Sequence, residues 1–145
     1  MAEEFAYFDT SVLVKRYVDE SGSVAARQLL RRYRLLTSVI APVEAISAVC
    51  RRRREGEVTP AALSAIAARL RADQAWWNLV EFDSRVRERA AGLIMDAPVR
   101  TLDAIHIASA LKFAAGSGRR LPFATADLRQ REAADRSGLR VLWVA

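Results

Sequence analysis

Two acidic side chains follow apolar runs that are typical of buried strands. Asp9 comes directly after Phe5-Ala6-Tyr7-Phe8, and Asp127 comes shortly after Leu121-Pro122-Phe123-Ala124-Thr125. A charge at the end of a buried strand is costly unless something pairs with it. The partner of Asp9 is therefore expected to be a helix N-terminus, a basic side chain or a metal ion.

Two further acids, Glu44 and Asp103, are expected in the first turns of helices, where the helix dipole favours an anion. Asp103 interrupts a segment that is apolar nearly all round, which predicts a helix buried on several sides. Taken singly, each of the four acids could be a helix cap or a complement to a helix dipole. Taken together they predict one pocket, because strand C-termini and the following helix N-termini share one edge of a parallel sheet.

Four carboxylates in one pocket would repel one another and raise their own pKa values. A divalent cation removes this conflict, and hard oxygen ligands suit Mg²⁺ or Mn²⁺. One or two such ions could orient and deprotonate a water and neutralise charge on a scissile phosphodiester. With no plausible Ser, Cys or Lys nucleophile near the acids, the pattern predicts hydrolysis by water, with His106 as the one possible side-chain base.

The elements that must hold these acids alternate between strand-like and helix-like segments. Apolar runs predict strands at 5–8, 35–39, within 76–82, at 121–125 and at 139–144. Periodicity and end signals predict helices at about 12–18, 24–33, 42–55, 60–73, 84–95, 102–115 and 127–136. This alternation implies an α/β fold with a central, mostly parallel five-stranded sheet and helices on both faces.

Short polar residues predict where several helices begin. The expected N-caps are Thr10 or Ser11, Thr59, Asp83 or Ser84, and Thr101. Pro60 suits a first helical position, because its missing N–H would be unpaired there anyway, and Gly56 is a typical helix end. The helix-rich stretch 42–73 is expected to form a helical hairpin, which could act as a clip or a dimer surface.

Length and composition indicate an ordinary globular protein. The 145 residues predict a single domain, and 52% of them are hydrophobic. No apolar run approaches the ~18 residues of a membrane span, and the acidic start of the chain lacks the basic region of a signal peptide. Cys50 stands alone, which excludes an intramolecular disulfide and fits a reducing cytoplasm.

The chain is basic, and arginine supplies nearly all of its positive charge. The formal net charge is +6, and Lys15 and Lys112 are its only lysines. Such a surface favours polyanions such as nucleic acid, although a compositional bias would produce it equally well. The run Arg51–Arg54 is either an RNA-binding patch or a solvated helix end favoured by the dipole. His106, among apolar neighbours, is interpreted as a structural side chain with its hydrogen bonds satisfied.

Four segments of the chain resemble the PIN-domain family, and specifically its VapC-like ribonuclease toxins. They are Tyr7-Phe8-Asp9-Thr10-Ser11, Val43-Glu44-Ala45, Leu102-Asp103-Ala104-Ile105-His106-Ile107-Ala108 and Phe123-Ala124-Thr125-Ala126-Asp127. The similarity extends over the whole chain in length, order and spacing. The first and third segments are the more specific, whereas the second is weak when taken alone.

The resemblance implies an α/β/α sandwich and an acidic Mg²⁺ or Mn²⁺ site. The family's metal-site acids map onto Asp9, Glu44, Asp103 and Asp127, and its frequent hydroxyl near the fourth acid onto Thr125. It further implies endoribonuclease activity, a homodimer, and neutralisation by a small antitoxin encoded beside the toxin. A cytoplasmic protein without membrane contact is expected.

Two other classes of function compete with a ribonuclease toxin. A PIN-like module could bind RNA or a protein without cutting, although such a module has no need to hold four like charges together. An Asp-based phosphatase of the haloacid dehalogenase type needs a second Asp two residues after Asp9, where Ser11 stands. A phospho-acceptor receiver needs a lysine at the end of a late strand, and both lysines of this chain are predicted in helices.

Overall fold

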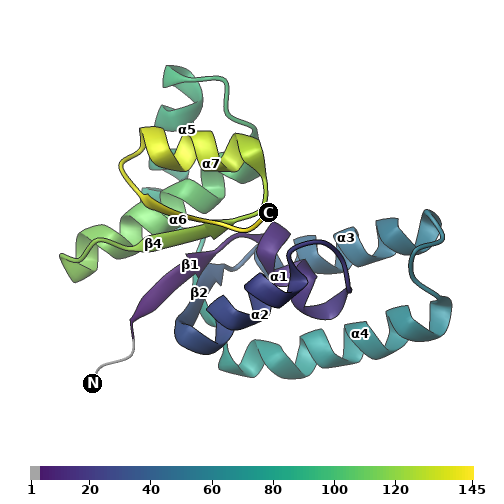
Figure 1. Ribbon diagram of the computed structural model, residues 1–145. Coiled ribbons are helices and arrows are strands. Elements are labelled where there is room, and N and C mark those ends of the chain that lie inside the picture. The colour runs from purple at the N-terminus through teal and green to yellow at the C-terminus, as the bar shows by residue number, and fades with distance from the viewer. Residues whose placement is uncertain (1–3) are drawn as a thin grey trace.

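A five-stranded, entirely parallel sheet forms the centre of the computed structural model, which describes residues 4–145 (Figure 1). Its strands stand in the order β3-β2-β1-β4-β5. Their bounds are Phe5–Phe8 (β1), Arg34–Ser38 (β2), Asn78–Val80 (β3), Pro122–Thr125 (β4) and Arg140–Trp143 (β5). All four pairings between neighbouring strands are parallel, which confirms the predicted sheet.

Helices cover both faces of this sheet (Figure 1). They are Thr10–Tyr17 (α1), Ser23–Arg32 (α2), Ala41–Arg54 (α3), Pro60–Asp73 (α4), Ser84–Asp96 (α5), Thr101–Ser117 (α6) and Leu128–Arg136 (α7), with a short 3₁₀ turn at Gln74–Trp76 (η1). Alternate side chains of β1 explain the two layers. Tyr7 packs into the core beneath α5, α6 and α7, whereas Phe8 packs against α1 and α2. The α/β/α sandwich is thus confirmed.

The predicted helical hairpin is formed by α3 and α4, which extend beyond the sheet as a pair (Figure 1). It has its own small core, in which Val49 of α3 and Leu70 of α4 are completely buried together with side chains of α1. Gly56 ends α3 with a φ of 79°, a left-handed conformation that other residues rarely adopt. The hairpin is therefore anchored through α1, the helix that follows Asp9.

Two helices begin one residue or more before the predicted position. Leu13 N–H donates to the Asp9 carbonyl at 3.3 Å, and Ala104 N–H donates to the Arg100 carbonyl at 2.9 Å. Asp9 and Arg100 are therefore the N-caps of α1 and α6, and the predicted caps Thr10, Ser11 and Thr101 were wrong. Thr10 and Ser11 lie inside the first turn, where their hydroxyls are free to reach other side chains.

The caps predicted at Thr59 and Asp83 are confirmed. The Thr59 hydroxyl accepts from Ala62 N–H at 3.1 Å, and the Asp83 carboxylate accepts from Val86 N–H at 3.0 Å. Within residues 4–145, no helix is both long enough and apolar enough to cross a membrane.

Candidate functional site

One cavity of about 620 Å³ is lined by all four predicted acids. It lies at the carboxyl edge of the sheet, as the parallel topology requires. Asp9 follows β1, Glu44 and Asp103 stand in the first turns of α3 and α6, and Asp127 follows β4. The structure therefore brings together side chains that lie up to 118 residues apart, the separation of Asp9 and Asp127 in the sequence.

Asp9 is the deepest of the four acids, with 3% of its surface exposed. The Thr125 hydroxyl donates to one of its carboxylate oxygens at 2.6 Å, and the Ser11 hydroxyl donates to the other. Burial raises the pKa of this carboxyl, whereas the charge of His106 and the two hydroxyls act in the opposite direction. A cation beside Asp9 would favour its charged form.

Asp103 shows the repulsion that the sequence predicts. It is half-buried, and burial is the largest cause that raises its pKa. The negative charge of Asp127 is the second cause and acts in the same direction, as does Glu44 more weakly, while His106 and Arg100 oppose them. The acids of the cavity thus act on one another electrostatically.

Glu44 is held by two side chains from different helices. Its Oε1 accepts from the Thr10 hydroxyl of α1 at 2.8 Å and lies 2.6 Å from Nε2 of His106 in α6. His106 is buried, and its Nδ1 lies 2.7 Å from the Tyr7 hydroxyl. His106 is therefore the satisfied buried side chain that was expected, but one of its partners is a candidate site acid.

Asp127 combines a structural role with its place in the cavity. As the N-cap of α7, its Oδ1 accepts from the N–H groups of Arg129 at 2.8 Å and Gln130 at 3.2 Å. The hydroxyl of Thr125 accepts from Asp127 N–H at 3.1 Å and donates to Asp9. The hydroxyl expected near the fourth acid therefore also holds the first.

The donor chemistry of the cavity fits a hard divalent cation, since four carboxylates share it. In the part of the chain from residue 4 onward, however, no three His, Cys, Asp or Glu side chains stand close enough to hold a metal ion together. The side chains of Asp9 and Glu44 make internal hydrogen bonds instead. The acids therefore fit such an ion by the type of their side chains and by the cavity that they share.

The four arginines at the end of α3 do not have one common environment. Arg51 is exposed and lines the cavity. Arg52 also lines it but pairs with Glu20 at 2.6 Å and with Glu57 at 3.7 Å. Arg53 and Arg54 are exposed and do not line the cavity. Arg51 is thus the member of this run best placed to meet an anion that enters the cavity.

Sequence reasoning missed the roles of three side chains, Thr10, Ser11 and His106. Each had a local signal, because Thr10 and Ser11 directly follow Asp9 and His106 lies one helical turn after Asp103. The signal did not say that Thr10 and His106 would meet at Glu44, which belongs to a third helix.

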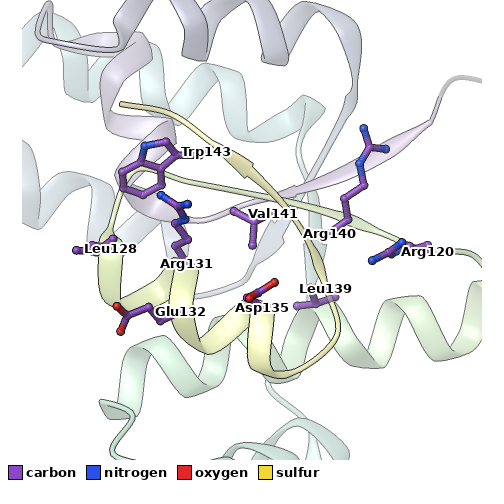
Figure 2. A pocket seen from close by; sticks show the side chains of 9 residues that line it. All are labelled: Arg120, Leu128, Arg131, Glu132, Asp135, Leu139, Arg140, Val141 and Trp143. Carbon is purple, nitrogen blue, oxygen red and sulfur yellow. The ribbon is translucent and has the colours of Figure 1, made fainter.

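A second hollow, of about 660 Å³, lies along α7 and the edge strand β5 (Figure 2). Figure 2 shows the Arg131 side chain beside Trp143, and its guanidinium stands 5.1 Å from the centroid of the indole ring. The acids of this hollow, Glu132 and Asp135, share it with arginines. It contains none of the predicted site residues, and so the acidic cavity remains the candidate site although it is slightly smaller.

A family model and a relative of known activity both match this chain over most of its length. The PIN domain family model matches residues 6–136. Ribonuclease VapC46 of Mycobacterium tuberculosis is 37% identical over 137 residues, which are 94% of this chain and 95% of that protein.

Two solved structures share the fold. A toxin-antitoxin complex from Klebsiella pneumoniae has a TM-score of 0.62 at 20% identity, covering 86% of this chain and 88% of its own. FitAcB from Neisseria gonorrhoeae has a TM-score of 0.61 at 18% identity, covering 95% and 96%. With the family model and a relative both matching over most of its length, the chain belongs to the PIN domain family.

Proposed function

We propose that this protein is a metal-dependent endoribonuclease that cleaves RNA phosphodiester bonds as the toxin of a toxin-antitoxin pair. The observation that carries the proposal is the single cavity lined by Asp9, Glu44, Asp103 and Asp127. The similarity to Ribonuclease VapC46 supports RNA as the substrate.

In this proposal the same four acids bind Mg²⁺ or Mn²⁺ and form the catalytic centre. When bound, the ion would supply an activated water and neutralise charge on the scissile phosphate. The chain's own hydrogen bonds prepare the ligands, since hydroxyls of Thr125 and Ser11 orient Asp9. Arg51, exposed at the cavity, would attract the RNA backbone.

The proposed partners are an RNA substrate, a small antitoxin and a second copy of the chain. An antitoxin is supported by the toxin-antitoxin complex among the structures of similar fold. The α3–α4 hairpin, which extends beyond the sheet, is the candidate dimer surface (Figure 1). We further propose that residues 1–145 act as one domain in the cytoplasm, where the RNA is. Identifying the neighbouring open reading frame tests the proposed antitoxin. Measuring the molar mass of the protein in solution tests the proposed dimer.

A second candidate is a PIN-like module that binds RNA or a protein without cutting. The observation that favours it is that the acids from residue 4 onward do not form a ready cluster of three ligands. The opposing argument is that gathering these acids is unfavourable. Burial and the charge of Asp127 raise the pKa of Asp103, and a module that only binds has no need for such an arrangement.

Cleavage of RNA separates these candidates. We expect purified protein to cut single-stranded RNA with Mg²⁺ or Mn²⁺ and to lose this activity in EDTA. Attack by water leaves 5′-phosphate and 3′-hydroxyl ends, whereas attack by the ribose hydroxyl leaves a 2′,3′-cyclic phosphate, and mass spectrometry distinguishes them. Cyclic phosphate ends would contradict the hydrolytic mechanism, and the absence of any cleavage would favour the binding module.

The matched control for the acids is Asp83, which lies outside the cavity and caps α5. Asp83→Asn should keep full cleavage, because asparagine is an equally good N-cap. Asp9→Asn or Asp127→Asn should abolish it, since each removes one charge from the cavity.

A further inference from the structure

A chain of short hydrogen bonds runs from the core of the protein to the acidic cavity. The Tyr7 hydroxyl lies 2.7 Å from Nδ1 of His106, and Nε2 of His106 lies 2.6 Å from Oε1 of Glu44. Tyr7 and His106 are both buried, with 0% and 2% of their surfaces exposed. The three residues come from β1, α6 and α3, so this chain of bonds ties three elements together at the site.

The positions of the protons follow from the chemistry of the partners. A carboxylate can only accept, so Nε2 must carry a proton and donate it to Glu44. Burial raises the pKa of Tyr7 well above its ordinary value, so the hydroxyl keeps its proton and can donate it to Nδ1. With Nε2–H donating to Glu44 and Nδ1 bonded to the Tyr7 hydroxyl, both ring nitrogens of His106 have partners.

Packing holds the ring of His106 in this orientation. The Tyr7 ring meets it edge to face, with the centroids 5.7 Å apart and the planes at 78°. Tyr7 is itself stacked on Phe123 of β4, at 5.1 Å and 5°. The imidazole therefore cannot turn away from Glu44 without disturbing the core.

We propose that Tyr7 and His106 are positioning residues that hold Glu44 in place as a metal ligand. Anchoring Oε1 restricts a flexible side chain before the metal arrives and leaves Oε2 for the cation. This inference rests on the proposed metal-dependent function, and it assigns to His106 a task that a merely structural residue would not have.

The test measures Mn²⁺ affinity by calorimetry in wild type and in four variants. His106→Leu removes the donor to Glu44, and we expect a 10- to 100-fold weaker Kd, roughly the usual effect of losing a partner of a metal ligand. Tyr7→Phe removes only the hydroxyl and should weaken binding less. His106→Gln offers an amide N–H toward Glu44 and should recover part of the affinity.

The matched control is Val86→Ala. Val86 of α5 is completely buried in the same core cluster as Tyr7, so its truncation disturbs that core without removing a bond to Tyr7, His106 or Glu44. Its Mn²⁺ affinity should equal that of wild type. If His106→Leu and His106→Gln are weakened alike, the loss comes from packing and the positioning role is wrong.

A spectroscopic readout tests the same role without metal. His106 is the one histidine of the chain, so ¹⁵N labelling of histidine gives a single pair of ring signals. We expect the Nε2 signal of a nitrogen that carries a proton both in wild type and in Tyr7→Phe, because Glu44 accepts from Nε2 in both. The Nδ1 signal should shift in Tyr7→Phe, because Nδ1 loses its bond to the Tyr7 hydroxyl. An unchanged Nδ1 signal in Tyr7→Phe would overturn the positioning role of Tyr7.

The outcomes also separate this inference from the proposed function. Equal Mn²⁺ affinity in wild type and His106→Leu would overturn the positioning role and leave the nuclease assignment intact. A wild type that neither binds Mn²⁺ nor cuts RNA would overturn both.

Discussion

Asp103 carries the clearest electrostatic cost of the cavity. Its pKa is raised first by burial and then by the charge of Asp127, and both causes disfavour the ionised carboxylate in the folded state. Its place in the first turn of α6 opposes them, because the helix dipole stabilises an anion there. The balance of these effects decides how a neutral side chain at this position changes stability.

Asp103→Asn should abolish cleavage and stabilise the metal-free protein. Asparagine nearly preserves the shape and removes the repulsion, a gain on the order of 1 kcal/mol at the scale of one pKa unit. Loss of the dipole interaction offsets about 0.3–1 kcal/mol of this gain. Thermal melts in EDTA check the prediction.

Excess Mg²⁺ should reverse the ranking, because the ion binds only the folded state and the variant lacks one ligand. If Mg²⁺ raises both melting temperatures equally, Asp103 is not a metal ligand.

The same charge predicts a pH dependence. The folded-state pKa of Asp103 lies above its unfolded value, so this carboxyl destabilises the fold at neutral pH. The destabilisation is relieved as the pH falls through the raised pKa, and it is gone below the unfolded value of about 3.9. In EDTA, the stability advantage of Asp103→Asn over wild type should therefore be largest at pH 7 and shrink toward pH 4. If the stability advantage of Asp103→Asn instead grew as the pH falls, the carboxyl of Asp103 would not destabilise the folded protein at neutral pH.

Helix α3 places two kinds of charge at its two ends. Glu44 in the first turn meets the positive end of the helix dipole, and the run that begins at Arg51 meets the negative end. Both Glu44 and Arg51 line the cavity, so this one helix contributes both an acidic and a basic side chain to it. The ion pair of Arg52 with Glu20 fixes that arginine against the neighbouring loop.

Arg51→Ala should therefore weaken RNA binding. It should also lower the slope of log K for RNA binding against log salt concentration by about the contribution of one phosphate contact. Arg51→Ala with Arg52→Ala should flatten it further only if Arg52 leaves Glu20 to meet RNA. Fluorescence titrations over a range of salt concentrations measure the slope, on Asp9→Asn protein to prevent cleavage. Arg54→Ala, exposed and away from the cavity, is the control. Equal slopes in all variants would show that these arginines do not contact RNA phosphates and form only a solvated helix end.

At the scale of the whole molecule, the turn before α2 lies against the last residues of the chain. Gly22 has a φ of 85°, and a Cβ built there would lie 2.5 Å from the Ala145 carbonyl oxygen. Gly138 has nearly the same backbone conformation, with a φ of 82°, but a Cβ there meets nothing within 4 Å. Both positions therefore have a backbone conformation that other residues rarely adopt. Only at Gly22 would a side chain also clash with a neighbouring segment.

Gly22→Ala should destabilise the protein more than Gly138→Ala does. Both lose the left-handed freedom of glycine, at a cost of roughly 1–2 kcal/mol, and only Gly22→Ala must also displace backbone. Urea unfolding of the two variants measures the difference. If Gly138→Ala costs as much as Gly22→Ala, the contact with Ala145 contributes nothing to stability.

Local patterns decided much of the fold. Thr59 and Pro60 mark the start of α4, since capping and a missing N–H act within one helical turn. The meeting of the four acids was predictable as well, because parallel strands leave few choices for where their C-termini lie. Hydroxyls misled the prediction at Thr10 and Thr101, since a residue that can cap a helix can also stand inside its first turn.

Contacts between distant segments were decided by the tertiary structure alone. Nothing within several residues of His106 indicates that its partners are Tyr7 and Glu44, which are 99 and 62 positions away. The same holds for Arg51 and Arg52, identical in type and adjacent, of which the second pairs with Glu20. The amino-acid sequence determined which side chains could do the chemistry and which sheet edge they share. Their hydrogen-bond partners depend on how β1, α3 and α6 pack, because such bonds reach only about 3 Å and form between whichever groups the packing brings together.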